Sequence, residues 1–155
     1  MTKQNHNRLK TLHKEHLKVK HPDLPEHFYP QKVWNDKSAN ALTRCVIDFL
    51  TFSGWQAERI SNTGRFIRDK NSLQGGYYIP GSGTNGTADI SATIKPNNLP
   101  YGISVKIEIK YGKDRQSEAQ KQYQEMIEKA GGVYLIVRNF DEFCEWYDNF
   151  INFKA

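Results

Sequence analysis

At 155 residues, the chain is long enough for one domain with a hydrophobic core of its own. Its formal charge of +5 favours an anionic partner such as nucleic acid but does not establish one. No apolar run approaches the roughly 18 residues of a membrane span, and the basic beginning lacks the apolar core of a signal peptide, so we expect a soluble, cytoplasmic protein without membrane contact. Cys45 and Cys144 lie in apolar, helix-like contexts and are expected to be buried free thiols.

Residues 1–32 differ in composition from residues 33–155, which we expect to form the folded domain. All 5 histidines lie in the first segment, where three leucines give only a weak helical stripe and prolines follow. We therefore predict a basic arm with one short helix. The spacing of His13 and His16 is compatible with metal binding, but no Cys or carboxylate set completes a site, which favours a solvated arm that contacts phosphates.

The first elements of the domain are marked by capping and turn residues. Ser38 suits the N-cap of a helix that runs to about Phe52. A strand over 55–60 follows, and after a turn a short strand is predicted over 65–68. Residues 71–87 are rich in Gly, Ser, Asn and Thr and are predicted to be a loop. The G-x-G-x-x-G within this loop precedes a strand-like run instead of a helix, so we reject a dinucleotide site there.

Two strand-like runs, 88–94 and 103–111, alternate strictly between apolar and polar residues. Successive side chains of a strand point to opposite faces. Asp89 therefore lies on the polar face of the first run, and Glu108 and Lys110 lie on the polar face of the second. The connector is rich in turn residues and predicts a hairpin. An Asp, a Glu and a Lys should then share one face of a sheet.

The last part of the chain predicts a helix, a strand and a helix. Ser117 and Gln120 fit a capping box at the start of the first helix, and Gly131 marks its end. The apolar run 133–137 is typical of a strand buried on both faces. Asp141 is predicted to cap the last helix. The order α-β-β-β-β-α-β-α indicates an α/β fold, with a mixed sheet of the α+β kind flanked by helices.

Two carboxylates on neighbouring strands can hold a divalent cation through hard oxygen ligands. Mg²⁺ keeps several waters, so Asp89, Glu108 and one backbone carbonyl, that of Ile109, would suffice. Lys110 would stand beside a hydrolytic water or a scissile phosphate. Gln120 could orient the same water, although the capping box alone also explains a Gln there. The competing interpretation of the strand pattern is an ordinary solvated polar face.

Four motifs in order give the chain a family resemblance. They are Gly86-Thr-Ala-Asp-Ile90, then Lys106-Ile-Glu-Ile-Lys110, then Ser117-Glu-Ala-Gln120, and then Ala130-Gly-Gly followed by an apolar strand. Together they resemble the VRR-NUC branch of the PD-(D/E)xK nuclease superfamily. The resemblance covers roughly residues 38–140.

The resemblance implies a restriction-endonuclease-like core that hydrolyses DNA phosphodiester bonds with Mg²⁺ or Mn²⁺. It also implies Asp89 and Glu108 as metal ligands, Lys110 as the catalytic lysine and Gln120 as the family glutamine. Stand-alone members of the family are often viral or bacterial, and some resemble Holliday junction resolvases that act as dimers. The cytoplasm of a bacterial or phage-infected cell is therefore the expected location.

The chain departs from the family pattern on the first core helix, where many relatives carry a supporting Glu. Asn40 is the nearest polar candidate on that helix, and Glu58 on the next strand is an alternative. This departure puts the number of bound metal ions in doubt. Basic residues flanking the proposed site are expected to contact DNA phosphates. They are Arg59, Arg65, Arg68, Lys113 and Arg115.

We expect a metal-dependent endonuclease that selects branched DNA. Two alternatives stay open: a non-catalytic DNA-binding module that keeps the nuclease fold, and a sequence-specific restriction-type nuclease. The sequence also leaves a homodimer open. Tyr77 and Tyr78 could stack on an exposed base, but packing within their loop is the preferred interpretation.

Overall fold

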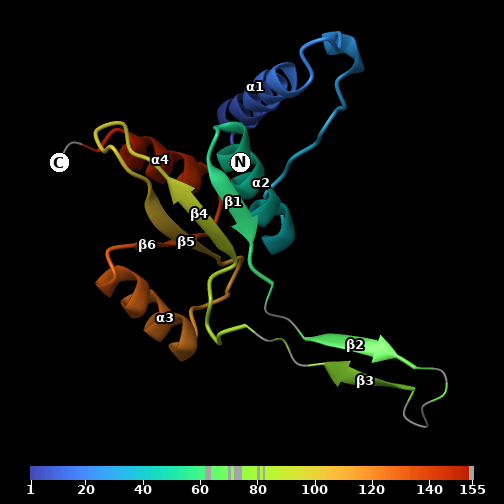
Figure 1. Cartoon of the computed structure of the whole chain (residues 1–155), viewed down its shortest axis with the longest axis vertical. Coiled ribbons are helices and arrows are strands. Elements are labelled where there is room, and N and C mark those ends of the chain that lie inside the picture. Colours follow the sequence, from blue (N-terminus) through green and yellow to red (C-terminus); the bar gives the residue numbers. More distant parts are fainter. Residues whose placement is uncertain (62–63, 70, 72–74, 80, 82, 154–155) are drawn as a thin grey trace.

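The computed structural model describes residues 1–61, 64–69, 71, 75–79, 81 and 83–153. Four helices, a 3₁₀ turn and six strands are arranged along this part of the chain (Figure 1). Their order and bounds are α1 Lys3–Lys20, η1 Glu26–Phe28, α2 Ala39–Phe52, β1 Gln56–Arg59, β2 Arg65–Arg68, β3 Gly76–Ile79, β4 Ile90–Ile94, β5 Ile103–Ile109, α3 Glu118–Lys129, β6 Val133–Val137 and α4 Phe140–Ile151.

A mixed sheet with the strand order β1-β4-β5-β6 forms the centre of the molecule. Strands β1, β4 and β5 pair antiparallel, and β6 pairs parallel to β5. The predicted hairpin of β4 and β5 is confirmed, with Ala92 opposite Val105 and Ile90 opposite Ile107. The predicted α/β class, a mixed sheet flanked by helices, is confirmed as well.

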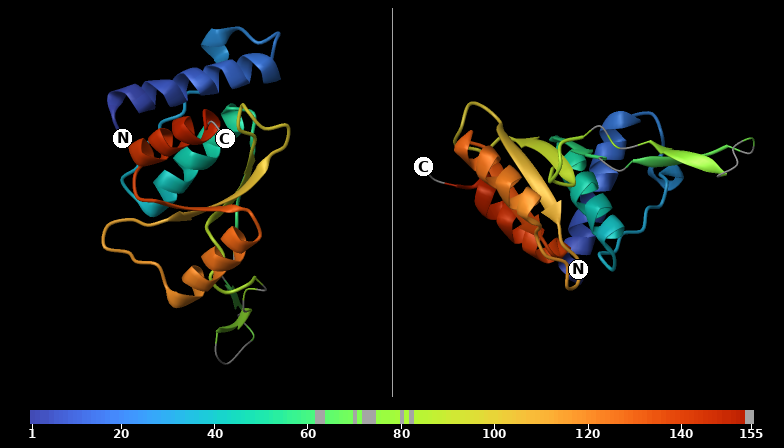
Figure 2. Two further views of the ribbon diagram at one scale, coloured as in Figure 1. Left: turned by 90° about the vertical axis from the view of Figure 1, so that its left-hand side faces the viewer. Right: turned by 90° about the horizontal axis from the view of Figure 1, so that it is seen from below.

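The two faces of the sheet are covered differently (Figure 2). Helices α2 and α4 cover one face, and α1 lies across them, whereas α3 lies on the other face. The apolar side chains of β4 and β5 point toward α2 and α4 and form the core with Phe49, Phe140 and Phe143, which are fully buried. Strict alternation in β4 and β5 thus places the core on one face and leaves the polar residues on the face of α3.

The first segment is more ordered than its composition predicts. Helix α1 has 18 residues instead of one short helix, and it packs on α2 and α4. Leu9 is fully buried in the common core, and Leu17 is 8% exposed. Residues 1–32 therefore do not extend away from the domain as an arm. A narrow leucine stripe suffices here because α2 and α4 already present an apolar surface to it.

Two local expectations were also wrong. Strand β3 forms inside the segment predicted to be a loop and pairs with β2 as a separate two-stranded sheet. The N-cap of α4 is Asn139, whose side chain accepts the Glu142 N–H, and not Asp141. Asp141 instead accepts hydrogen bonds from the Thr2 backbone N–H and the Asn5 amide, and so holds the start of α1.

The cysteine prediction is confirmed, since Cys45 and Cys144 are both free and buried. No helix in the described residues is long and apolar enough to span a bilayer.

Replacement of Asp141 by Asn should loosen the docking of α1. Burial acts to raise the pKa of Asp141, but the hydrogen bonds from Thr2 and Asn5 outweigh it and lower that pKa from 3.8 to about 2. A carboxyl group whose pKa is lower in the folded than in the unfolded chain stabilises the fold at pH values above the unfolded pKa. This stabilisation is lost as the pH falls through the folded pKa. We expect Asp141→Asn to cost about 1 kcal/mol at neutral pH, measured by urea unfolding.

The difference in unfolding free energy between Asp141→Asn and the parent chain should narrow as the pH falls from 3.8 to about 2. Glu142→Gln, a change to the next side chain, which makes no contact with α1 among the described residues, serves as control. Equal stability of Asp141→Asn and the parent at neutral pH would contradict the assignment.

Candidate active site

Polar side chains gather on the face of the sheet that α3 partly covers. Ser91 lies opposite Lys106 in the register of β4 and β5, and the Lys106 Nζ donates to the Ser91 Oγ at 2.6 Å. Asp89 precedes β4 by one residue, and Glu108 lies near the end of β5. The same alternation that buries the isoleucines on one face therefore brings these polar groups together on the other.

Asp89 is fixed by two hydrogen bonds at the edge of this face. Its Oδ2 accepts the Ile109 N–H at 2.8 Å, and its backbone oxygen accepts the Ile60 N–H at 2.8 Å. The β4–β5 register, continued by one residue, places Asp89 directly opposite Glu108. The two predicted carboxylates are therefore cross-strand neighbours.

Glu108, Lys110 and Gln120 form a buried hydrogen-bonded triangle. The Lys110 Nζ lies 3.0 Å from the Glu108 Oε1 and donates to the Gln120 Oε1 at 2.9 Å. The Gln120 Nε2 donates to the Glu108 Oε1. Glu108 is 2% exposed and Lys110 is 4% exposed, so the two charges neutralise each other largely out of water. Lys110 also approaches the Asp114 carboxylate at 3.4 Å.

Burial sets the ionisation of Glu108. Removal from water raises its pKa above the ordinary value, the hydrogen bond from Lys110 opposes this rise, and the charge of Asp89 adds to it. Tyr134 of β6 completes the environment, because its hydroxyl donates to the Glu108 Oε2 at 3.3 Å. Burial is also the main cause that raises the pKa of Tyr134, so this hydroxyl remains a donor.

The capping box of α3 positions Gln120. The Ser117 Oγ accepts the Gln120 N–H, and the Gln120 Oε1 accepts the Ser117 N–H at 2.9 Å, as the sequence predicts. Gly86 allows the loop before Asp89 to reach this helix. Its φ is +81°, and a Cβ at this position would collide with the backbone carbonyl of Ala119. A glycine is therefore required where the loop crosses the first turn of α3.

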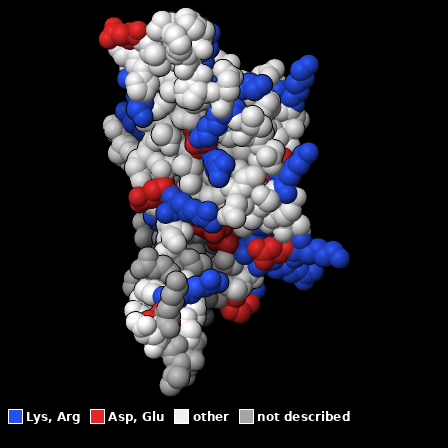
Figure 3. Space-filling model, turned by 90° about the vertical axis from the view of Figure 1, so that its right-hand side faces the viewer, with Lys and Arg blue, Asp and Glu red and all other residues white. Residues whose placement is uncertain are grey.

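A pocket of about 560 Å³ opens beside Asp89. Asn40 and Arg59 line it together with Asp89, and the Arg59 Nη2 donates to the Asn40 Oδ1 at 2.9 Å. Figure 3 views the molecule from the right-hand side of Figure 1 and shows recessed acidic atoms with basic side chains beside them, just above the projecting β2–β3 sheet. Arg59 is exposed and Asp89 is partly buried, so this pocket brings a cationic and an anionic side chain together.

The other predicted residues lie around this centre. Glu58 is exposed on β1 opposite Ser91, and so shares the polar face without contacting Asp89 or Glu108 among the described contacts. Arg68 is exposed on β2, and the Arg65 side chain lies outside the described part of the structure. Lys113 and Arg115 are exposed between β5 and α3.

Sequence reasoning missed Tyr134 and Asp114. Tyr134 pairs with Lys106 in the parallel register, so it lies on the same face as Glu108. The prediction that the strand 133–137 is buried on both faces does not distinguish the side chains on the face of Glu108 from those on the core face. The tyrosine hydroxyl within an apolar strand was the available signal, since a buried hydroxyl requires a partner.

Carboxylate oxygens are the ligands that a hard divalent cation prefers, and Asp89 and Glu108 are cross-strand neighbours. In the residues that the structure describes, no three His, Cys, Asp or Glu side chains form a group able to hold a metal ion. Asp89 and Glu108 provide two sets of carboxylate oxygens, and Mg²⁺ needs few protein ligands because it retains water. Both Glu108 oxygens have partners in the structure, so cation binding would require Glu108 to exchange one of them. The backbone N–H of Ile109 donates to Asp89. The backbone carbonyl of Ile109 is the oxygen that we expected as a further ligand.

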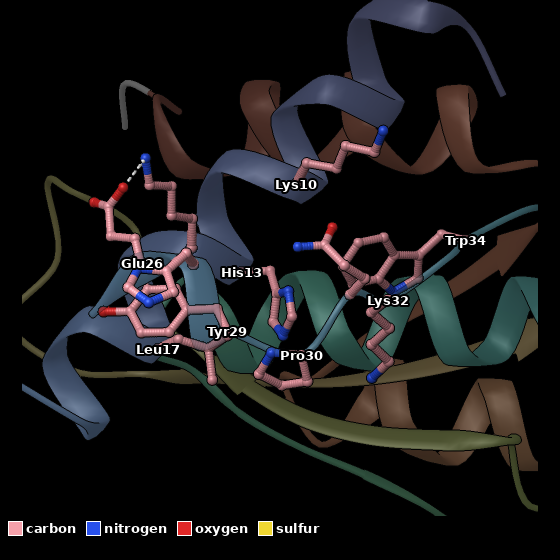
Figure 4. A pocket seen from close by; sticks show the side chains of 11 residues that line it. Lys10, His13, Leu17, Glu26, Tyr29, Pro30, Lys32 and Trp34 are labelled. Carbon is pink, nitrogen blue, oxygen red and sulfur yellow. Dashed lines mark ion pairs between the residues drawn. The ribbon is translucent and has the colours of Figure 1, made fainter. Parts of the chain in front are cut away.

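A second cavity, of about 430 Å³, lies between α1 and the segment after η1 (Figure 4). Lys10, Lys14 and Lys32 line it, but Lys14 is paired with Glu26 and Lys32 with Asp48, each at 2.6 Å. Its aromatic walls, Tyr29 and Trp34, are buried. This cavity contains no carboxylate pair like that of Asp89 and Glu108, so it has no means for the same chemistry.

Comparisons of the chain with protein-family models, with curated proteins and with solved structures find no match.

Replacement of Gly86 by Ala should disturb the site while sparing the core. The added Cβ would force the loop away from α3, and the positive φ would add strain, for a cost of about 1–3 kcal/mol. We expect a lower melting temperature and a change in the amide NMR signals of Asp89 and Gln120. Gly112 also has a positive φ, of 60°, but no atom lies near its Cβ position, so Gly112→Ala isolates the effect of backbone strain. Equal losses of melting temperature in Gly86→Ala and Gly112→Ala would contradict the conclusion that Gly86 is required for the close approach of its loop to α3.

Replacement of Lys110 by Met should destabilise the chain in a pH-dependent way. Without the ammonium, the pKa of buried Glu108 should rise further, so the folded carboxyl would keep a proton that the unfolded one releases above its ordinary 4.5. The free energy of unfolding should therefore fall as the pH rises from the pKa of Glu108 in the unfolded chain toward its higher pKa in the folded chain. We expect a loss of about 3 kcal/mol near neutral pH and a smaller loss in acid, measured by urea unfolding. In the double variant Glu108→Gln/Lys110→Met the pH dependence should disappear, and its persistence would show that another group causes it.

Proposed function

We propose that the chain is a Mg²⁺- or Mn²⁺-dependent DNA endonuclease with a restriction-endonuclease-like core of the VRR-NUC type. The observation that carries the proposal is the hydrogen bond from the Ile109 N–H to Asp89, which holds this carboxylate at the position opposite Glu108. Glu108 is in turn bound to Lys110 and Gln120. A carboxylate pair and an ammonium on adjacent strands are the groups that metal-assisted phosphodiester hydrolysis needs. The sheet order β1-β4-β5-β6, with α3 between β5 and β6, is compatible with such a core.

In this proposal each side chain has a separate task. Asp89 and Glu108 would hold the cation, which when bound polarises the phosphate and makes a water more acidic. The Lys110 ammonium would face the scissile phosphate and offset the negative charge that develops as water attacks phosphorus and a P–O bond breaks. Gln120 holds Lys110 through its carbonyl oxygen and Glu108 through its amide nitrogen, so it acts as a positioning residue.

The substrate we propose is branched DNA, and the location is the cytoplasm of a bacterial or phage-infected cell. Arg59 lines the pocket beside Asp89 and is exposed, so it can bind a phosphate at the entrance. The basic charge of the whole chain supports a polyanionic substrate. A sequence-specific nuclease would differ by yielding discrete fragments from plasmid DNA.

A non-catalytic DNA-binding module is the second candidate function. It is favoured by one observation: both oxygens of Glu108 already have hydrogen-bond partners, in Lys110, Gln120 and Tyr134. Such a module would bind DNA with equal affinity in the presence and absence of divalent cations and would cut no substrate.

The test of the proposal is the change Asp89→Asn. An Asn oxygen can still accept the Ile109 N–H, so the fold should persist while the charge that holds the cation is lost. We expect the rate of cleavage of labelled junction and flap DNA with Mg²⁺ or Mn²⁺ to fall at least about 100-fold. Asp23→Asn alters an exposed aspartate outside the site and should leave the rate unchanged. Absence of cation-stimulated cleavage by the parent chain on every substrate would favour the binding module.

A further inference from the structure

The two-stranded sheet of β2 and β3, here called the ribbon, lies in the sequence between two segments that line the pocket beside Asp89. The chain enters it after Ile60, whose N–H binds the backbone oxygen of Asp89, and returns through Thr87 and Ala88. Ile60, Thr87 and Ala88 line the same pocket as Asp89. Figures 1 and 2 show the ribbon projecting from the body of the molecule. A substrate in the pocket would therefore lie at the base of the ribbon.

One face of the ribbon uses its aromatic rings to hold the two strands together. Phe66 and Tyr78 are cross-strand partners. The Phe66 ring covers Gly76 and the Tyr78 ring covers Gly64, so closely that neither glycine could carry a side chain. An isolated pair of strands is only marginally stable in water, and such cross-strand packing stabilises it.

The other face presents one exposed aromatic ring. Tyr77 lies opposite Ile67, on the face away from Phe66 and Tyr78. Its side chain is 54% exposed, and it has no hydrogen bond, ion pair or ring contact in the structure as described. Ile79, two residues further on the same face, is 41% exposed. An exposed apolar patch on a projecting element marks an interaction surface.

The charge of the segment indicates the chemistry of its partner. Between Ser61 and Thr87 the sequence has three basic residues and one acidic residue, a net charge of +2. An exposed flat ring on a segment of net positive charge matches nucleic acid, in which a base offers a π-face and the backbone offers negative charge. Bases within a duplex are already stacked on each other, and inserting a ring between them costs unstacking energy, so an unpaired base is the favoured partner of Tyr77.

We propose that Tyr77 stacks on an unpaired base of branched DNA, next to the phosphate that the candidate active site receives. This inference rests on the proposed function, and it identifies the ribbon as the element that distinguishes branched from continuous duplex DNA. Arg59 at the pocket entrance binds the backbone, and the ribbon reads the loss of pairing. Tyr78 is excluded as the stacking residue because its ring already covers Gly64.

The experiment measures DNA binding without divalent cations, so that cleavage does not enter. The probes are a flap with 2-aminopurine at the first unpaired position and a linear duplex of the same sequence. Tyr77→Ala should bind the flap about tenfold more weakly and lose the quenching of 2-aminopurine, whereas duplex binding should not change. Tyr77→Phe keeps the ring and should restore both signals.

The matched control is Tyr101→Ala. Tyr101 is 62% exposed in the turn between β4 and β5, at the end of the sheet away from Asp89. Its replacement should change neither affinity nor quenching. Thermal unfolding of all variants should match the parent chain, since neither tyrosine is buried.

Three outcomes would overturn the inference. They are unchanged flap binding by Tyr77→Ala, equal weakening for flap and duplex, and conversion of a dimer to a monomer by the same change, which would make the ribbon a contact between two copies. Quenching that depends on Tyr77 in a chain that cuts no DNA would refute the proposed nuclease but keep the inference. Flap cleavage that is unaffected by Tyr77→Ala would support the proposed nuclease and refute the stacking role of Tyr77. Failure of the parent chain to bind DNA would refute both the proposed nuclease and the stacking role.

Discussion

A single amide side chain, that of Gln120, connects the secondary structure to the chemistry of the site. Its oxygen accepts the Ser117 N–H, which fixes the start of α3, and also accepts a hydrogen from Lys110. Its nitrogen donates to Glu108. The cap of α3 and the buried ion pair of β5 therefore share one side chain, and each helps to hold the other in place. Because unpaired buried charges are costly, this mutual dependence makes the geometry of the site part of the fold.

The two faces of the sheet are held by different kinds of interaction. The isoleucines and valines of β4 and β5 face α2 and α4, and they form the core. The alternate residues of the same strands face α3, where Glu108 and Lys110 are buried and hydrogen-bonded to their neighbours. Changes on the polar face therefore alter charge and hydrogen bonding, while the apolar face continues to hold the layers together.

Periodicity and capping predicted the centre of the molecule well, because these signals are local. The alternation of 88–94 and 103–111 predicted the hairpin and the shared face of Asp89 and Glu108, and Ser117 with Gln120 predicted the start of α3. The close approach of Gly86 to α3 is a contact between distant segments, which no local pattern encodes.

The errors have physical causes of the same kind. Helix α1 was underestimated because its stability comes from the surface of α2 and α4 and not from its own weak stripe. Strand β3 was missed because two glycines precede a very short run, and cross-strand packing compensates for their flexibility. At α4, Asn139 and Asp141 are both good capping residues, and the burial of Phe140 together with the contacts of Asp141 to α1 decides between them.

The position of the ribbon in the chain has a consequence for how the molecule can diversify. Strands β1 and β4 are neighbours in the sheet and pair directly, although more than two dozen residues separate them in sequence. Strands β2 and β3 are thus an insertion between the two strands of an antiparallel pair, and they add no strand to the main sheet. Natural variation or laboratory grafting can lengthen, shorten or exchange this insertion without shifting the register of the sheet. The projecting surface can therefore change while the polar face of β4 and β5 keeps its arrangement.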